Sequence, residues 1–341
     1  MIDQPDFFYP LGMESRGELK ILLYQENHRG ENRSGSNISS NKNFLTEIRV
    51  LNQKELIELI KLTGLEKYAD YMGKNIMTQI PNNIERIPKI MAIANATPDS
   101  FFEGSRISSS TISRIIEFKP DIIDVGGEST RPHSVEIDSK TEISRLENVM
   151  ETLKNNYDGI VSLDTRHPEV ADHFKDRIDI INDVSGLYNG EMIKIAAEEK
   201  LQYVLMHIKG EVNKMLQNAK YDDLPGEMAK FFFSRLKKMM DMGMPCNRII
   251  IDPGLGFSKT HDHDYFLVKN PNVYSLGFPR LVGHSRKRFL GYVTGVEAER
   301  RLPETLATSL FLKQKGIEIL RVHDPDENIR FLKQFRFLSQ A

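Results

Sequence analysis

The stretch Asp121-Ile-Ile-Asp-Val-Gly-Gly-Glu-Ser-Thr-Arg-Pro132 decides the fold of this chain. Its apolar run ends in two glycines, and Glu128, Ser129, Thr130 and Arg131 follow directly. In α/β folds with parallel strands, ligand sites lie at the carboxyl ends of the strands. Packing alone does not require such polar residues there, so the stretch predicts a bound ligand. The arginine indicates that this ligand carries negative charge.

The same pattern recurs along the chain and predicts its architecture. Together with the opening stretch there are eight short apolar runs, and each leads into polar residues. Their length and residue bias are typical of parallel strands that are buried on both faces. The other seven runs are Lys89–Ala94, Gly159–Leu163, Ile178–Ile181, Gln202–Met206, Arg248–Ile251, Pro279–Gly283 and Ile317–Leu320.

The stretches between these runs are long enough for a helix and two loops. Apolar residues at helical spacing predict helices over Ser139–Lys154, Glu191–Lys200, Glu227–Met242 and Pro303–Lys315. Eight strand–helix units over roughly 250 residues make up a (β/α)8 TIM barrel. A doubly wound open sheet would need a glycine-rich phosphate turn after its first strand, and Ala94-Asn-Ala-Thr-Pro98 is not one.

Residues 1–87 are predicted to form a small α+β extension to the barrel, which we place at residues 88–341. Glu18–Tyr24 and Thr46–Leu51 are predicted as strands, and Gln53–Leu62 and Glu66–Met72 as helices. The polar segment Gln25–Asn43 is rich in Asn, Ser and Gly, which is typical of a mobile loop or linker. The extension suggests no chemistry, so a stabilising or dimer-forming role is the default.

The composition excludes several classes of protein. The chain has 341 residues and a net charge of −2, which argues against a nucleic-acid or membrane-surface binder. A single cysteine, Cys246, fits a reducing cytoplasm, and no apolar run approaches the length of a membrane span. The short run His261-Asp-His-Asp264 is predicted to open a helix rather than to bind a metal.

The polar strand ends form eight motifs along residues 88–335. They are Asn95-Ala-Thr-Pro-Asp-Ser-Phe101, Asp124-Val-Gly-Gly-Glu-Ser-Thr-Arg-Pro132, Ser162-Leu-Asp-Thr165, Ile181-Asn-Asp183, Met206-His-Ile-Lys-Gly210, Asp252-Pro-Gly-Leu-Gly-Phe257, Ser285-Arg-Lys287 and Arg321-Val-His-Asp324. In this order they resemble the motifs of the dihydropteroate synthase family. The resemblance implies a cytoplasmic transferase, usually a homodimer, that uses Mg²⁺ and is a target of sulfonamides. Its reaction joins 4-aminobenzoate to 6-hydroxymethyl-7,8-dihydropterin diphosphate and yields 7,8-dihydropteroate and diphosphate.

The resemblance also assigns roles to residues of this sequence. The pterin is expected at Asp164, Asn182, Asp252, Phe257 and Lys287. The aminobenzoate is expected at Phe101, Thr130, Pro132 and Ser285. The diphosphate is expected at Asn95, Arg131, Arg286, Arg321 and His323, with Asn95 also holding Mg²⁺. Catalysis is expected to depend on Asn95, Glu103, Arg131, Lys287, Arg321 and His323.

Two loops, Ala96–Ser105 and Glu128–His133, are expected to close over the substrates. Loss of Arg131 or Arg321 should then damage turnover far more than the fold.

This sequence departs from the family pattern at several positions, and Ser105 replaces a flexible second glycine of the first loop. Glu103 stands where the first loop commonly has Asp, His133 where Gly is usual, and Arg288 where a small residue is usual. These changes surround the aminobenzoate side, so a different amine substrate stays open. Two further alternatives are a pterin-dependent methyltransferase, which would have no diphosphate to hold, and a pterin-binding paralogue without activity.

Overall fold

The computed structural model describes residues 2, 4–14, 17–26, 38–40, 44–79, 86–95, 109–128, 136–187, 190–210 and 219–339. Contacts within the chain divide it into two compact units. Unit 1 comprises Met1–Asn83, Tyr221–Asp241 and Leu267–Phe278; unit 2 comprises Ile84–Lys220, Met242–Phe266 and Pro279–Ala341. The boundary predicted at residue 87 lies near the first division, but two later segments also belong to unit 1.

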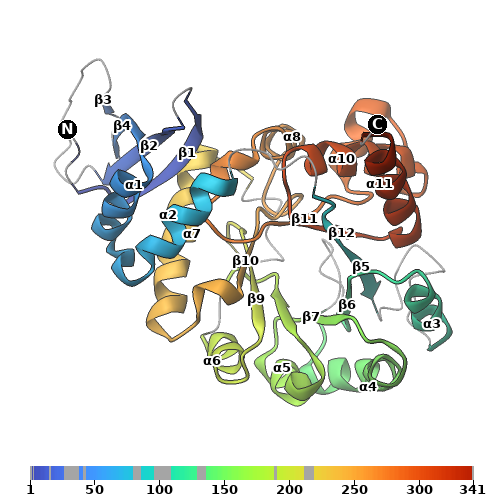
Figure 1. Ribbon diagram of the computed structural model, residues 1–341. Coiled ribbons are helices and arrows are strands. Elements are labelled where there is room, and N and C mark those ends of the chain that lie inside the picture. The colour runs from blue at the N-terminus through green and yellow to red at the C-terminus, as the bar shows by residue number, and fades with distance from the viewer. Residues whose placement is uncertain are drawn as a thin grey trace. The chain divides into compact units, whose positions relative to one another are not determined.

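Unit 2 is an eight-stranded parallel barrel, as predicted (Figure 1). Its strands are hydrogen-bonded in the order β10-β9-β8-β7-β6-β5-β12-β11. A parallel bridge between Ile251 and Arg280 closes the ring, with a hydrogen bond of 2.8 Å from the Ile251 N–H to the Pro279 carbonyl. The strands are β5 (Lys89–Asn95), β6 (Ile122–Gly126), β7 (Ile160–Asp164), β8 (Ile180–Asp183), β9 (Gln202–Met206), β10 (Ile249–Asp252), β11 (Leu281–Gly283) and β12 (Ile319–Val322).

Successive side chains along each strand point to opposite faces, and this alternation places polar residues directly above the core. One apolar cluster inside the barrel takes a residue from most of the strands: Met91, Ile122, Ile180, Val204, Ile250, Leu281 and Ile319. Two residues further along four of these strands, the same face carries Asp124, Asn182, Asp252 and Arg321. These four side chains therefore face the barrel interior near the carboxyl ends of the strands.

Helices cover the outside of the barrel (Figure 1). The helices predicted over 139–154, 191–200 and 303–315 are confirmed, and another helix begins at His261, as predicted. Proline is the first or second residue of three of these helices (Pro168, Pro303 and Pro325), where it has no N–H to lose. The helices and short turns of unit 2 are α3 (Ser109–Glu117), α4 (Ser139–Asn156), α5 (Pro168–Phe174), η4 (Lys175–Arg177), α6 (Glu191–Glu198), η6 (Cys246–Arg248), α8 (His261–Lys269), α9 (Arg288–Thr294), η8 (Ala298–Arg300), α10 (Leu302–Gln314) and α11 (Pro325–Ser339).

Unit 1 contains an antiparallel sheet in the order β1-β2-β4-β3. The predicted strands are confirmed in β2 and β4, whereas β1 and β3 were not predicted. β3 lies inside the predicted linker, whose residues 27–37 and 41–43 are outside the described part of the chain. The elements of unit 1 are β1 (Phe7–Met13), β2 (Leu19–Glu26), β3 (Ile38–Ser40), β4 (Phe44–Leu51), α1 (Gln53–Ile60), η1 (Lys61–Leu65), η2 (Glu66–Tyr68), α2 (Ala69–Gln79), α7 (Leu224–Asp241) and η7 (Pro271–Tyr274).

Within unit 1, β1 packs against α7. The ring of Phe8 lies 5.1 Å from that of Phe233 in an edge-to-face arrangement. The side chain of Gln79, at the end of α2, accepts a hydrogen bond of 3.1 Å from the Gly277 N–H. The N-terminal segment therefore shares a core with segments that come much later in the sequence.

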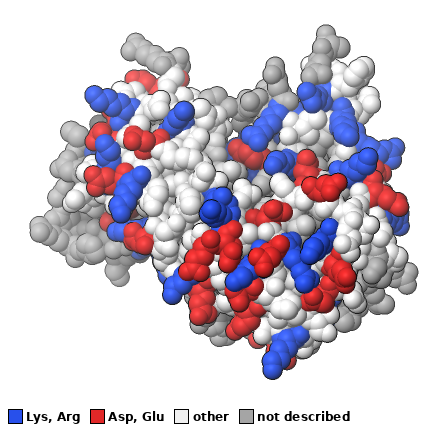
Figure 2. Space-filling view, turned by 60° about the horizontal axis from the view of Figure 1, so that its bottom comes forward, with Lys and Arg blue, Asp and Glu red and all other residues white. Residues whose placement is uncertain are grey.

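Within the described residues, no helix is long and apolar enough to cross a membrane. Figure 2 shows one face of the molecule, where lysine and arginine side chains are interspersed with aspartate and glutamate. This mixture matches the net charge of −2 and differs from the clustered basic surface that nucleic-acid binding requires.

Candidate active site

A single arginine joins three strands at the carboxyl end of the barrel. Arg321 of β12 donates hydrogen bonds of 2.6 Å through Nε to Asp124 Oδ2 of β6 and of 2.6 Å through Nη2 to Asp164 Oδ2 of β7. Asn182 of β8 donates a hydrogen bond of 3.1 Å to the same Asp124 oxygen. Charge-assisted bonds of this kind are strong and directional. Arg321 therefore neutralises two buried carboxylates and fixes their relative positions.

Two buried oxygens of this bridge accept no hydrogen bond from the described part of the protein: Oδ1 of Asp124 and Oδ1 of Asp164. Burial raises the pKa of Asp164 to about 7, although Arg321 opposes the change. Burial also raises the pKa of Asp252, opposed by Lys287. Buried acceptors without donors are costly, so a ligand that presents N–H groups is favoured here.

The turn after β10 brings three predicted pterin residues together. Asp252 Oδ1 accepts a hydrogen bond of 2.7 Å from the Gly254 N–H. The ammonium of Lys287 donates to the Leu255 carbonyl and lies 5.0 Å from the ring centroid of Phe257. Burial lowers the pKa of Lys287 to about 8, opposed by Asp252. An aromatic ring, a cation and a carboxylate thus surround one position, as a flat heterocycle with polar edges would require.

Ser285 and His323 meet beyond the ends of β11 and β12. The Ser285 hydroxyl lies 3.2 Å from His323 Nδ1 and accepts a hydrogen bond of 3.2 Å from the His323 N–H. Arg286 behaves differently: its guanidinium binds both oxygens of Asp324, at 2.8 and 2.6 Å. It also donates to two carbonyl oxygens in η8. Through these contacts, Arg286 holds the Ser285–Lys287 segment against Asp324 and η8.

Asn95 ends β5 beside Gly126, the last residue of β6. A Cβ atom added to Gly126 would lie 3.3 Å from Asn95 Oδ1 and 3.2 Å from the Asp164 carbonyl oxygen, so the missing side chain lets the strand ends converge. Carboxamide and carbonyl oxygens are hard ligands of the kind that Mg²⁺ binds, together with water and phosphate. The donor set around Asn95 therefore fits the metal role predicted for it.

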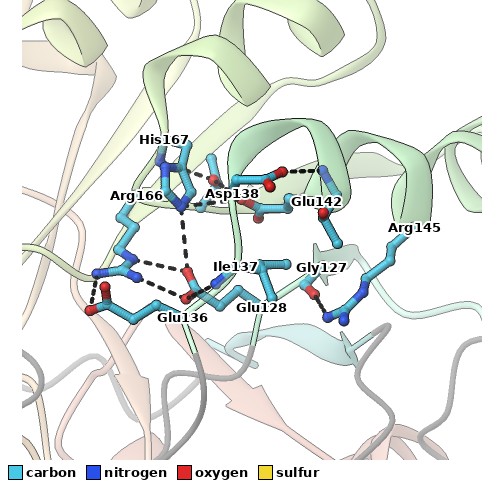
Figure 3. Close-up of polar contacts among 11 residues, drawn as sticks. Gly127, Glu128, Glu136, Ile137, Asp138, Glu142, Arg145, Arg166 and His167 are labelled. Carbon is cyan, nitrogen blue, oxygen red and sulfur yellow. Dashed lines mark hydrogen bonds and ion pairs between the residues drawn. The ribbon is translucent and has the colours of Figure 1, made fainter.

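A second polar cluster lies where β6 leads into α4 (Figure 3). Arg166 donates to both oxygens of Glu128, at 2.9 and 2.8 Å, and to Glu136 at 3.0 Å. Glu128 also accepts a hydrogen bond of 3.3 Å from the Ile137 N–H. Residues 129–135 lie outside the described part of the chain. The contacts of Arg166 therefore join the two described ends of that segment.

The same cluster contains a possible set of metal ligands. Glu128, Glu142 and His167 place ligand atoms within 4.8 Å of one another. His167 Nε2 lies 3.7 Å from Glu128 and 4.0 Å from Glu142 (Figure 3). Burial raises the pKa of Glu142 to about 8, although the Thr165 hydroxyl donates to it. Because Arg166 already binds both oxygens of Glu128, the geometry favours an ion-pair network.

Apart from Arg286, which is held by Asp324, the predicted site residues separate into two sets. The structure gathers most of them around the carboxyl end of the barrel: Asn95, Asp164, Asn182, Asp252, Phe257, Ser285, Lys287, Arg321 and His323. The others lie outside the described residues, together with the whole first loop and most of the second: Phe101, Glu103, Thr130, Arg131 and Pro132.

One site residue had no predicted role. Asp124 is fully buried, and it holds both Arg321 and Asn182. Its signal was present in the sequence, because a carboxylate two residues after Ile122 must share the face of that apolar side chain on β6. A charge on the inner face of a buried strand requires a partner, and Arg321 supplies it.

The fold and the site together define a barrel enzyme that binds a polar ligand at the carboxyl ends of its strands. A family model described as pterin binding enzyme matches residues 91–323. The dihydropteroate synthase of Escherichia coli K12 is 34% identical over 72% of this chain and 90% of its own length. The bifunctional dihydropteroate synthase/dihydropteroate reductase of Helicobacter pylori is 35% identical over 87% of this chain and 80% of its own. The latter similarity therefore extends beyond the barrel into unit 1.

Solved structures agree with these relatives. The dihydropteroate synthase of Yersinia pestis in a sulfonamide complex has a TM-score of 0.69 and 29% identity, over 76% of this chain and 96% of its own. The Xanthomonas albilineans dihydropteroate synthase with 4-aminobenzoic acid has a TM-score of 0.69 and 32% identity, over 75% of this chain and 95% of its own. This chain belongs to the pterin-binding enzyme family, on its dihydropteroate synthase branch.

Proposed function

We propose that this chain synthesises 7,8-dihydropteroate from 4-aminobenzoate and 6-hydroxymethyl-7,8-dihydropterin diphosphate. The C–O bond to the diphosphate breaks, the C–N bond to the amine forms, and the amine loses a proton. The observation that carries the proposal is the Asp124–Arg321–Asp164 bridge beside Asn182, whose two buried oxygens have no donor among the described residues. A pterin edge presents adjacent N–H donors that suit such oxygens.

The pterin is assigned to the interior of the barrel. Asp252 and Asn182 would receive its polar edges, and Phe257 and Lys287 would lie against its ring. Asp164 would accept from the heterocycle through its open oxygen. This arrangement uses side chains from β7, β8, β10 and the segment after β11, so it depends on the closed barrel.

The diphosphate is assigned to the rim, at Asn95, Arg131, Arg321 and His323. Mg²⁺ held by Asn95 would supply positive charge against the departing diphosphate. Electrostatic stabilisation of the leaving group should carry most of the rate, because the dihydropterin ring can delocalise the charge left on the carbon. The contacts of Arg286 with Asp324 favour a supporting role for it rather than direct phosphate binding.

The amine is assigned to Phe101, Thr130, Pro132 and Ser285. Two relatives have been solved with ligands of this kind, a sulfonamide in one and 4-aminobenzoic acid in the other, which supports 4-aminobenzoate as the amine. Sulfonamides should therefore compete with the amine. We also propose a cytoplasmic homodimer, whose subunit number can be measured by light scattering.

The test of the synthase is product formation by the full chain. Incubation with the dihydropterin diphosphate and Mg²⁺, with and without 4-aminobenzoate, should give 7,8-dihydropteroate only when the amine is present. Pterin binding without product would instead favour a non-catalytic relative or another amine. In that case Glu103, His133 and Arg288 are the first residues to change to the family pattern. Methyl transfer from a folate would favour the methyltransferase.

The Helicobacter pylori relative favours a second candidate function, reduction of dihydropteroate. That relative is named as bifunctional, and its similarity to this chain reaches into unit 1. The reaction would add a hydride and a proton to dihydropteroate, so it needs a reduced nicotinamide or flavin as donor. The full chain would be incubated with dihydropteroate and each donor, and tetrahydropteroate measured. Its absence with every donor would leave the synthase as the single activity.

A further inference from the structure

Lys259 is a buried lysine that the proposed reaction does not use. It is 5% exposed and lies in unit 2, at the end of the turn that follows β10. Its Nζ lies 2.9 Å from His207 Nδ1, and it donates hydrogen bonds of 3.0 Å to the carbonyl oxygens of both Gly254 and Phe257. The lysine therefore joins two residues of the turn, Gly254 and Phe257, to each other and to His207 at the end of β9.

The contacts of Lys259 suit its charged form, and the His207 carbonyl, at 3.4 Å from Nζ, is a fourth and more distant acceptor. An ammonium has three N–H donors and no acceptor, so it matches the three close acceptors, whereas a neutral amine would satisfy two. Burial lowers the pKa of Lys259 to about 7, and Asp264 opposes this change. Burial and then Lys259 hold the pKa of His207 well below its ordinary value. When Lys259 is charged, neutral His207 accepts its hydrogen bond through Nδ1, and the proton of the ring then lies on Nε2.

The same turn carries two proposed pterin contacts. The N–H of Gly254 donates to Asp252 Oδ1, while the Gly254 carbonyl accepts from Lys259. The Phe257 carbonyl also accepts from Lys259. Gly254 has a φ of +65°, and a Cβ there would lie 2.1 Å from the His207 carbonyl oxygen, so the turn passes very close to β9. A small displacement of this turn would move both Asp252 and Phe257.

We propose that Lys259 is a positioning residue for the pterin. Its ammonium holds the turn between Asp252 and Phe257 against His207, and this keeps the carboxylate and the aromatic ring in the geometry that binds the heterocycle. The inference rests on the proposed function, because it takes Asp252 and Phe257 as pterin contacts. It adds that the affinity for the pterin, rather than for the amine, depends on a lysine that touches neither substrate.

The variant that tests this is Lys259→Met, which keeps the length of the side chain and removes its donors. The affinity for 6-hydroxymethylpterin should fall about 10- to 100-fold, and the KM for the dihydropterin diphosphate should rise in parallel, because small displacements at a site have effects of this size. The KM for 4-aminobenzoate should change little. Equal changes in both KM values, or an unchanged pterin affinity in a folded variant, would overturn the inference.

Lys313→Met is the matched control. Lys313 is 2% exposed, and its Nζ lies 5.1 Å from the ring of Phe335. It lies near the end of α10 that leads into β12, and so at the opposite end of the barrel from the site. Lys313→Met should leave the pterin affinity unchanged. A loss equal to that of Lys259→Met would mean that removing any buried lysine has this effect, and would contradict a positioning role.

A measurement on the unmodified protein covers the case in which Lys259→Met does not fold. ¹⁵N NMR of histidine-labelled protein should show neutral His207 with its proton on Nε2 and Nδ1 as an acceptor. A proton on Nδ1 would overturn the inference. The proposed function fails separately, when the unmodified protein neither binds the pterin nor forms dihydropteroate.

Discussion

Asp252 is the carboxylate that tests the pterin assignment most directly, because it ends β10 and is expected to accept from the heterocycle. Asp252→Asn keeps the volume but can put an N–H₂ group where the pterin needs an acceptor. We expect the affinity for 6-hydroxymethylpterin to fall about 10- to 100-fold, measured by calorimetry. Asp262→Asn, in the exposed first turn of α8, is the control. An unchanged affinity in Asp252→Asn would place the pterin elsewhere.

Arg321 is proposed to bind the diphosphate, and it also bridges Asp124 and Asp164. Arg321→Ala should therefore reduce both turnover and stability. From the sequence, the loss of turnover was expected to be far larger than the effect on the fold. The buried bridge to Asp124 and Asp164 adds the expectation of a large loss of stability. Breaking a buried ion pair by removing one partner costs about 3–5 kcal/mol of folding free energy. Urea unfolding at neutral pH measures this cost.

The control for that variant is Arg330→Ala. Arg330 pairs with Asp326 on α11, and its side chain is 77% exposed. Exposed pairs contribute little because water and salt screen them. Stability equal to wild type in Arg321→Ala would show that the two carboxylates find other partners or take up protons.

At the scale of elements, the barrel strands could be predicted because their periodicity is simple. Each is a short apolar run between polar segments, and being buried on both faces leaves little ambiguity. Strand β1 could not be predicted in this way. Its sequence contains Pro10 and Gly12, and its register with β2 shifts between these two residues. Both residue types weaken the strand signal, while packing on α7 supplies the stability that the local sequence lacks.

The sequence predicts which residues form the site, but not which of them bind one another. Strand ends identify Asp164, Asn182, Asp252 and Arg321 as polar groups at one edge. The partner of each group depends on barrel closure, which brings Arg321 to Asp124 across 197 positions of sequence. The ion pair of Arg286 with Asp324 also depends on the folded barrel, because it joins the segments after β11 and β12. A sequence pattern carries no information about such a choice of partner.

Glu142 in α4 makes stability depend on pH. Burial raises the pKa of its carboxyl to about 8, from an ordinary value of 4.5. Between these values the folded protein keeps a proton that the unfolded chain has released. The group therefore stabilises the protein fully below the lower value, and this contribution falls as pH rises, by about 1.4 kcal/mol per pH unit.

We expect Glu142→Gln to remove this slope. The variant should gain stability relative to wild type as pH rises from about 5 to 8, as measured by urea unfolding at each pH. Glu151→Gln changes an exposed residue of the same helix and should leave the slope intact. Parallel curves for wild type and Glu142→Gln would mean that Glu142 is already charged in the folded protein.

Arg166 should influence the amine site through the segment whose ends it joins. Thr130 and Pro132 lie between Glu128 and Glu136 in sequence, and Arg166 binds both glutamates. We expect Arg166→Gln to raise the KM for 4-aminobenzoate about tenfold, because misplaced contacts lose affinity, and to leave 6-hydroxymethylpterin binding unchanged. Steady-state kinetics with each substrate varied in turn would measure this.

Arg177→Gln is the control for Arg166→Gln. Within the described part of the chain, Arg177 also pairs with a glutamate of α4, but this is Glu147, at 3.0 Å, rather than Glu128 or Glu136. Arg177→Gln should keep the wild-type KM for 4-aminobenzoate. The same increase in both variants would assign the effect to a general loss of ion pairs beside α4.

At the scale of the whole molecule, the N-terminal segment should be a structural requirement. Phe8 is fully buried against Phe233 of α7 within unit 1, whereas Leu11 of the same strand is 37% exposed. Phe8→Ala should cost about 3–5 kcal/mol of stability, because it leaves a cavity in the core. Leu11→Ala should cost far less. Similar thermal unfolding of the two variants would mean that β1 contributes little to unit 1.

The division of unit 1 into three separate segments also has a consequence during translation. The first 83 residues leave the ribosome before Tyr221–Asp241 and Leu267–Phe278 exist. At about 5–20 residues per second, the roughly 140 residues in between take about 7–28 s to synthesise. During that interval Phe8 has no α7 to cover it. A ribosome-associated chaperone should therefore bind the nascent chain at the apolar face of β1 that contains Phe8. It should release the chain only after residue 241 has emerged.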